Sequence, residues 1–200
     1  VMFVIDVSGS MGDEGGDGRT DLAIYRPSTG QWWVRRASNG SFFVVSFGIS
    51  TDEPVQSDFD GDFKTDIAVY RDGIWYILLS SNGSVRILNW GLAGDRPMAG
   101  DFDGDGSSDL AVYRGGGWWI FESLTSTATS IPFGTATDIP APADFDGDGS
   151  TDIVVFRPSN GDWYVRRSSN GSITGLHWGQ AGDIPVPSRI IYDDSLSPLK

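Results

Sequence analysis

The most distinctive chemical feature of the sequence is an acidic loop that occurs in four copies. The loop is nine residues long, and in its best copies aspartates occupy positions 1, 3, 5 and 9, separated mainly by glycine and other small residues. Four carboxylates this close together repel one another unless a cation lies between them. Carboxylate and carbonyl oxygens are the ligands that hard divalent cations prefer. The spacing therefore predicts metal coordination.

The predicted ligands in each loop are its aspartates and the backbone carbonyl of position 7. The second copy offers Asp58, Asp60, Asp62 and Asp66 with the Lys64 carbonyl. The third copy offers Asp101, Asp103, Asp105 and Asp109 with the Ser107 carbonyl, and the fourth Asp144, Asp146, Asp148 and Asp152 with the Ser150 carbonyl. A flexible cage of protein oxygens suits Ca²⁺ better than Mg²⁺, so we expect three to four Ca²⁺ ions per chain. An EF-hand is excluded because position 12 is not Glu and the flanking segments are strand-like.

Two copies depart from the best pattern. The first copy lacks a carboxylate at position 3, where Gly15 stands, and it is expected to bind most weakly. Its ligands would be Asp13, Asp17 and Asp21 with the Arg19 carbonyl. In the second copy Phe63 occupies position 6, where the third and fourth copies have glycine. If this position needs a positive φ, a non-glycine residue weakens the loop.

The loops belong to a repeat that runs through almost the whole chain. The strings DFDGDF, DFDGDG and DFDGDG begin at residues 58, 101 and 144, and each is followed by an apolar run, an aromatic pair and an aromatic-Gly step. An aspartate and a proline follow each of those steps, as in Asp52 and Pro54. We divide the chain into copies 13–57, 58–100, 101–143 and 144–188, after a leading segment 1–12 and before a tail 193–200.

Each copy has the pattern of about four short strands. The run DLAIYR alternates, with Leu22, Ile24 and Arg26 on one face. The SNGS segments predict hairpin turns of type I′, in which Asn-Gly adopts positive φ. Four strands in a repeat of this length are typical of a β-propeller blade. The predicted fold is therefore all-β, a β-propeller of four blades, each a four-stranded antiparallel sheet.

Closure of the ring has more than one solution. The segment 184–192 has the pattern of a surplus first strand, so the simplest arrangement places this terminal strand in the first blade. The alternative gives the first blade residues 1–7 as its own first strand. A fragment of a larger ring, or a homo-oligomer in which two chains complete one ring, also fits the sequence.

The repeat DFDGDG-x-x-D-[LI]-A-V-Y-R resembles the FG-GAP/VCBS repeats of integrin α-subunit propellers and of many exported bacterial proteins. The resemblance implies a β-propeller with calcium in the loop that joins the first two strands of each blade. It also implies adhesion or recognition outside the cell or at its surface, and seldom catalysis. Some fungal lectins have similar blades and bind sugars between them.

A second resemblance concerns the first twelve residues, VMFVIDVSGSMG. They are similar to the first strand and metal-ion-dependent adhesion motif of von Willebrand factor A domains, which implies Asp6, Ser8 and Ser10 as ligands of Mg²⁺ or Mn²⁺. That motif also requires residues from distant loops of another fold, whereas this chain continues directly into the repeats. We therefore expect the segment to serve only as a strand or fusion remnant.

Composition restricts the function further. A net charge of −13 argues against a nucleic-acid partner, and the absence of cysteine excludes thiol catalysis and disulfides. No apolar stretch is long enough for a membrane span. His177 is the only histidine and takes an ordinary strand position, so we expect no enzyme. The recurrent aromatic pairs are expected in the core, and the recurrent arginines as structural partners of acids or carbonyls.

The predicted function is that of an extracellular, calcium-stabilised adhesion or protein-interaction module, with a protein or glycan partner. A calcium-dependent lectin and a domain of a secreted hydrolase are the alternatives.

Overall fold

The fold is given by a computed structural model, which describes residues 5–7 and 21–186. These residues form strands and no helix, so no helix in this part of the chain could cross a membrane. The sixteen strands form four antiparallel sheets of four, and the first strand of each sheet lies before the acidic loop that begins the corresponding sequence copy. We number the sheets as blades 1 to 4 in chain order.

The strand bounds follow the repeat closely. Blade 1 contains β1 (Ile5–Val7), β2 (Asp21–Arg26), β3 (Gln31–Arg35) and β4 (Phe42–Ser46). Blade 2 contains β5 (Glu53–Ser57), β6 (Asp66–Arg71), β7 (Ile74–Leu78) and β8 (Val85–Asn89). Blade 3 contains β9 (Arg96–Gly100), β10 (Asp109–Arg114), β11 (Gly117–Phe121) and β12 (Ala128–Pro132). Blade 4 contains β13 (Ile139–Pro140), β14 (Ile153–Arg157), β15 (Asp162–Arg166) and β16 (Ile173–His177).

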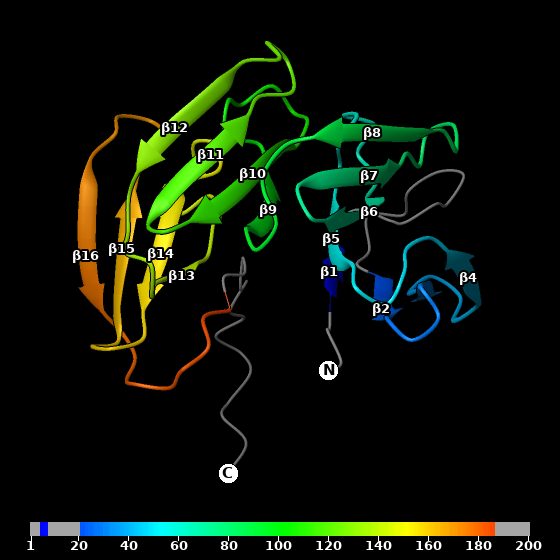
Figure 1. The fold of residues 1–200 in the computed structure, drawn as a ribbon, viewed down its shortest axis with the longest axis horizontal. Helices are drawn as coiled ribbons and strands as arrows, with labels where there is room; N and C mark the ends of the chain where they lie inside the picture. Colours follow the sequence, from blue (N-terminus) through cyan, green and yellow to red (C-terminus); the bar gives the residue numbers. More distant parts are fainter. Residues whose placement is uncertain (1–4, 8–20, 187–200) are drawn as a thin grey trace.

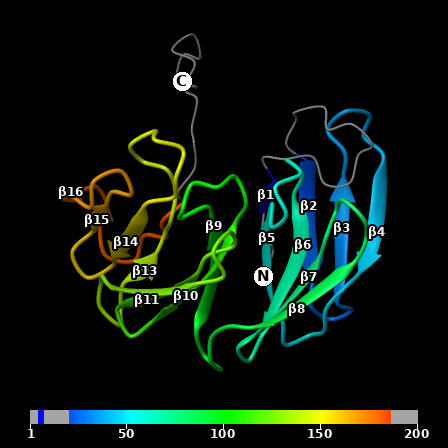
Figure 2. The ribbon, with the colours of Figure 1, turned by 90° about the horizontal axis from the view of Figure 1, so that it is seen from above.

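The four blades follow one another along an arc (Figure 1). The first strands lie toward the middle of the arc and the last strands, β4, β8, β12 and β16, lie on its outside. Seen from above, blades 1 and 4 stand at opposite ends of the arc (Figure 2). The predicted all-β propeller with four four-stranded blades is confirmed.

Proline shapes the first strand of blades 2 to 4. Pro54, Pro97 and Pro140 each lie in that strand, which is an edge of its sheet and therefore tolerates a residue without an N–H donor. Blade 4 has a second proline, Pro142, and its first strand is only two residues long. Pairing resumes beyond it at the isolated bridge between Ala143 and Asp152.

The hydrophobic core lies between successive blades. The first aromatic residue of each pair in blades 1 to 3 is fully buried, and its indole N–H donates to a backbone carbonyl of its own blade. These residues are Trp32, Trp75 and Trp118. Each packs in a cluster that the second strand of the following blade completes. The prediction that the aromatic pairs form the core is therefore confirmed for their first members in blades 1 to 3, whereas Trp163 of blade 4 is half-buried.

An ion pair extends the ladder between the first two strands of blades 2 to 4. Arg71, the last residue of β6, donates two hydrogen bonds at 2.6 and 2.8 Å to Asp52, which directly precedes β5 of the same blade. The same bidentate contact joins Arg114 to Asp95 and Arg157 to Asp138. The aspartates are buried, while the arginines are partly exposed. The prediction that the recurrent arginines are structural partners of acids is confirmed for these three.

The first blade is completed from the N-terminus. β1 pairs antiparallel with β2, Ile5 opposite Ala23, and so occupies the first-strand position that the simplest sequence interpretation gave to segment 184–192. At this position the alternative arrangement is correct, because the leading apolar residues can form the edge strand themselves. Residues 184–186 are not in a strand, and residues 187–192 lie outside the described part of the chain.

The SNGS hairpins are present, but their predicted turn type is wrong. A type I′ turn needs positive φ at both central residues, whereas Gly40 has φ 71° and Asn39 does not have positive φ. The turn is longer, with the Gly40 N–H donating to the Arg36 carbonyl. Asn39 acts through its side chain, which accepts a hydrogen bond from the Ser41 N–H at 2.8 Å.

These ion pairs predict strong coupling between their two members. Arg114→Leu should lower the free energy of unfolding by about 2 kcal/mol, because Asp95 stays buried without its counter-charge. Adding Asp95→Asn should cost less than it does alone, since the uncompensated charge is removed. Urea unfolding of the two single variants and the double variant measures the coupling. Additive losses would contradict a direct interaction.

Candidate metal centres

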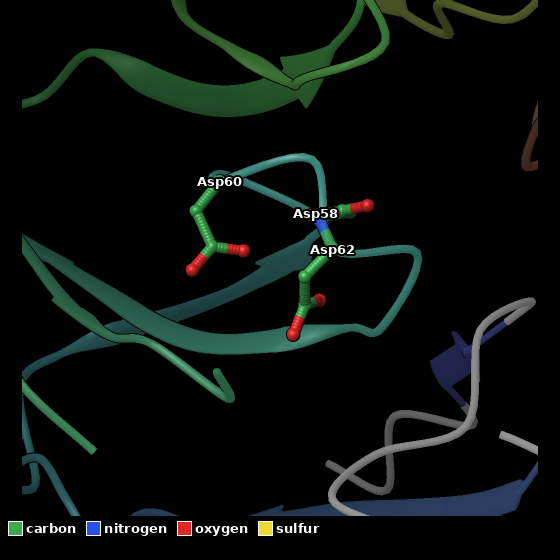
Figure 3. A group of neighbouring side chains, drawn as sticks. All are labelled: Asp58, Asp60 and Asp62. Atoms are coloured by element: carbon green, nitrogen blue, oxygen red, sulfur yellow. Dashed lines mark hydrogen bonds between the residues drawn. The ribbon is translucent and has the colours of Figure 1, made fainter. Parts of the chain in front are cut away.

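The acidic loops lie where each blade's first strand turns into its second. In blades 2, 3 and 4 three aspartates of each loop bring carboxylate oxygens within 4.8 Å of one another. The three groups are Asp58, Asp60 and Asp62; Asp101, Asp103 and Asp109; and Asp144, Asp146 and Asp152. Figure 3 shows the first group, in which the side chains of Asp60 and Asp62 extend to the same side of the loop. The structure thus brings together three of the four predicted carboxylates in each loop.

The aspartate at position 1 fixes the shape of its loop. Asp58 accepts hydrogen bonds from the backbone N–H groups of Gly61 and Phe63, both at 2.7 Å, and from that of Asp62. Asp101 accepts the three equivalent bonds in blade 3. Each carboxylate oxygen has more than one lone pair, so these bonds leave capacity for a cation.

The aspartate at position 9 connects the loop to the β-hairpin beside it. Asp66 is fully buried and accepts from the Phe59 N–H at 2.9 Å and the Ser80 N–H at 2.7 Å. Asp109 and Asp152 repeat both contacts in their blades. This residue therefore has a structural role that the metal-binding pattern alone does not reveal.

Serine hydroxyls from the hairpin also reach the loops, and the sequence reasoning did not select them. The hydroxyl groups of Ser80, Ser123 and Ser168 donate to the position-5 aspartates Asp62, Asp105 and Asp148. Ser81 and Ser169 donate to the position-3 aspartates Asp60 and Asp146. The available signal in blades 2 and 4 was the recurrence of Ser-Ser before Asn-Gly, whereas in blade 3 no Asn-Gly follows Ser123.

Neighbouring loops are joined by their backbones. The Asp58 carbonyl accepts a hydrogen bond from the Ser108 N–H of the next loop at 2.6 Å. The Asp101 carbonyl accepts from the Thr151 N–H at the same distance. The loops of blades 2, 3 and 4 therefore form one continuous row on the same side of the arc.

The clustered carboxylates are costly to ionise together. Burial, and to a smaller extent the neighbouring Asp103 and Asp101, raise the pKa of Asp109 to about 6. Burial is also the main cause of the raised pKa values of Asp58, Asp66 and Asp103. A cation among these groups would favour their charged forms and reverse the shifts.

The residues present fit a hard divalent cation. The Asp60 Oδ1 atom is buried and has no hydrogen-bond partner, although its other oxygen accepts from Ser81. No ion pair between described residues involves an aspartate of these three loops. An all-oxygen donor set with uncompensated negative charge and an orphaned buried oxygen is what a calcium ion would complete.

Other predicted sites lie partly outside the described residues. In the first copy Asp13, Asp17 and Arg19 lie outside them, while Asp21 is buried and accepts from the Ala37 N–H at 2.8 Å. Asp21 thus occupies the same structural position as Asp66. Of the adhesion-like motif, Asp6 lies in β1, and Ser8 and Ser10 lie outside the described residues.

Position 6 of the loops requires a left-handed backbone. Phe63 has φ 64°, and its counterparts Gly106 and Gly149 have φ 91° and 95°. Phe63 is 85% exposed, so its side chain gains little packing to offset the strain.

Comparison with known proteins agrees with the fold. An FG-GAP-like repeat matches residues 101–155, and an FG-GAP repeat matches residues 137–176. No curated protein matches the chain. Residues 101–176 therefore match FG-GAP repeats, and the four-stranded sheets of the described residues are the blades of a β-propeller.

Two solved structures are similar over most of this chain. The crystal structure of BBS1N in complex with ARL6DN, soaked with mercury, has a TM-score of 0.54 and 13% identity, over 88% of this chain and 55% of that one. The same complex soaked with lead has a TM-score of 0.48 and 16% identity, over 92% and 57%. This chain spans little more than half the length of those chains. At this identity the mercury-soaked structure shows a shared fold alone.

The strain at Phe63 predicts opposite effects for two substitutions at the same loop position. Phe63→Gly should raise the free energy of unfolding by about 0.5 kcal/mol, because relief of strain exceeds the added conformational freedom of the unfolded chain. Gly106→Ala should lower it by about 1 kcal/mol, since the added Cβ meets no atom within 4 Å and strain alone acts. Urea unfolding checks both, and changes of the same sign would show that backbone strain does not control this position.

Proposed function

We propose that this chain is a calcium-binding β-propeller that acts outside the cell as a protein-interaction module. The observation that carries the proposal is the threefold recurrence of converging carboxylates that form no ion pair with any described residue. Calcium would hold each loop in its compact form by neutralising the aspartates at positions 1, 3 and 5 or 9. The protein's own residues orient these ligands through backbone N–H groups and serine hydroxyls.

The proposed role as an interaction module rests on the fold and on how the acidic residues are used. FG-GAP repeats support a β-propeller that binds protein partners, and the similar structure of BBS1N is of a complex with ARL6DN. The loop aspartates are engaged with backbone and hydroxyl donors of their own blade. His177 of the exposed outer strand β16 contacts Asp162 of β15, with 2.7 Å between the His177 Nδ1 and Asp162 Oδ1 atoms. This pair therefore lies on the surface of the blade.

The proposed location outside the cell follows from the expected strength of the sites. Calcium sites with dissociation constants of about 0.1–1 mM are filled in extracellular fluid and empty in cytosol. At millimolar calcium a site with a dissociation constant of about 0.1 mM adds about 1.4 kcal/mol to the free energy of unfolding. Three such sites would add about 4 kcal/mol, a large part of the stability of a typical domain.

Calcium titration tests this function directly. Calorimetry should give about three sites per chain, and Asp103→Asn should remove one of them, because Asp103 belongs to the converging group of blade 3. The matched control is Asp72→Asn, which changes an exposed aspartate in the β6–β7 turn and should leave the number of sites unchanged. Melting curves with calcium and with chelator should differ in Tm by several degrees. An absence of calcium-dependent heat and of a Tm shift would overturn the proposal.

The carboxyl pKa values predict how this stabilisation depends on pH. Without calcium, the folded chain binds more protons at Asp109 than the unfolded chain between the ordinary pKa of 3.8 and about 6, so ionisation lowers stability as pH rises through this window. Bound calcium requires the charged form and removes this loss. The Tm difference between calcium and calcium-free buffers should therefore grow from pH 4 to pH 7. A difference independent of pH would contradict ligation by these groups.

A further inference from the structure

The residue that opens the β-hairpin beside the acidic loop occupies one structural position in blades 2 to 4. Its N–H donates across the hairpin to the carbonyl five residues later, and the serine that follows it makes the hydroxyl contact with the position-5 aspartate. This residue is Leu79 in blade 2, Glu122 in blade 3 and Arg167 in blade 4. The same position is therefore neutral beside one loop, negative beside the second and positive beside the third.

Glu122 is held in place by the hairpin that it opens. Its Oε2 atom accepts hydrogen bonds from the hydroxyl groups of Thr125 and Thr127 at 2.8 and 2.6 Å, and its Oε1 atom accepts one from that of Thr129 at 2.9 Å. These bonds, that from Thr127 most of all, lower the pKa of Glu122, so its carboxylate is charged at neutral pH. Three hydroxyl groups thus fix a negative charge at one place on the hairpin.

The charge of Glu122 lies beside the blade 3 loop. Ser123, the next residue, donates from its N–H to Asp109 at 2.7 Å and from its hydroxyl to Asp105 at 2.9 Å, so Glu122 is one residue away from two contacts with the loop. Burial and, to a smaller extent, neighbouring carboxylates that include Glu122 raise the pKa of Asp103. Glu122 therefore acts electrostatically on a member of the converging group of blade 3.

Arg167 takes the same place beside the blade 4 loop with the opposite charge. Ser168, which follows it, donates from its N–H to Asp152 at 2.8 Å and from its hydroxyl to Asp148 at 2.9 Å. Arg167 donates to the Ser172 hydroxyl of its own hairpin and forms no ion pair among the described residues. Its charge therefore acts on the loop through space, where it opposes the binding of a cation as a negative charge favours it.

The blade 3 hairpin also differs in the hydroxyl groups that it offers to its loop. Ser81 and Ser169 donate to the position-3 aspartates of blades 2 and 4, whereas the corresponding residue of blade 3 is the exposed Leu124. Asp103, the position-3 aspartate of blade 3, accepts from the Asp105 N–H at 3.2 Å. Since a hydroxyl donor occupies a lone pair, its loss leaves Asp103 more capacity for a cation. The blade 3 hairpin thus supplies a full negative charge where the others supply a second hydroxyl.

We propose that the charge at this hairpin position sets the calcium affinity of the adjacent loop, so that Glu122 strengthens the blade 3 site and Arg167 weakens the blade 4 site. This inference rests on the proposed function, because it concerns the same sites. The aspartate pattern alone makes the two loops alike, since both carry all four aspartates and a glycine at position 6. The hairpins would then give one chain sites that fill at different calcium concentrations.

Calcium titration of the whole chain by nuclear magnetic resonance resolves the sites, because the amide groups of Gly61, Gly104 and Gly147 each donate to the position-1 aspartate of their own loop. At low ionic strength the Gly104 signal should reach its midpoint at less calcium than the Gly147 signal. Glu122→Gln keeps the size of the side chain and removes its charge. It should raise the dissociation constant of the blade 3 site about threefold, the effect of a unit charge on a divalent ion at about 10 Å in water. Arg167→Gln should lower that of the blade 4 site by a similar factor.

Two further variants separate charge from structure. Glu122→Asp keeps the charge but is too short for all three threonine contacts, and it should stay within about twofold of the original affinity. Asp72→Asn, the matched control, removes the same charge from the turn at the other end of β6 and should leave all three midpoints unchanged. The charge effects should shrink in about 0.5 M salt.

Three results would each overturn the assignment of affinity to charge: an unchanged midpoint in Glu122→Gln, a larger loss in Glu122→Asp than in Glu122→Gln, or effects that salt does not reduce. A chain in which calcium moves none of the three glycine signals would instead contradict the proposed function itself.

Discussion

A buried carboxylate at the turn that enters each blade, paired with the arginine at the end of that blade's second strand, fixes how one blade follows another in this arc. Asp52, Asp95 and Asp138 each directly precede the first strand of a blade, and the apolar side chains of the second strand fill the space between this sheet and the preceding one. The contact depends on the proline-led edge strand and the aromatic-Gly corner being in register. Since no blade buries its aromatic face within itself, each sheet is stable only as a neighbour of another.

The acidic loops combine two tasks in one set of residues. The position-1 aspartate organises the loop and the position-9 aspartate ties it to the adjacent hairpin, while the aspartates between them remain directed toward shared space. The raised pKa values of Asp58, Asp66, Asp103 and Asp109 express the cost of this crowding. The loops are therefore already shaped by hydrogen bonds before any cation is added, which reduces the reorganisation that binding would require.

Much of this could be predicted from the sequence because the repeat samples the same structure four times. The blades and the buried aromatic residues follow from features that the copies share; these residues are Trp32, Trp75 and Trp118. The positive φ at loop position 6 follows from the glycine of two copies and from Phe63, which replaces it in the second. The pairing of Asp52 with Arg71 was not predicted, because within one copy the two residue types recur without indicating that they bind across the copy boundary. The predicted turn type of the SNGS hairpins was wrong because Asn39 acts through its side chain. The simplest prediction for the first strand of blade 1 was wrong because segments 1–7 and 184–192 both have the pattern of an edge strand, and β1 takes that position.

The row of loops has a consequence for how order spreads along the arc. The carbonyl of Asp58 is bound by the backbone of the next loop, and that of Asp101 by the loop after it. If one loop unfolds, the neighbouring loop loses the backbone hydrogen bond that joins the two, whereas an ordered loop keeps that bond and restrains its neighbour. The conformations of adjacent loops are therefore coupled. Tension applied to one end of the arc is passed from blade to blade along its rim as well as through its core.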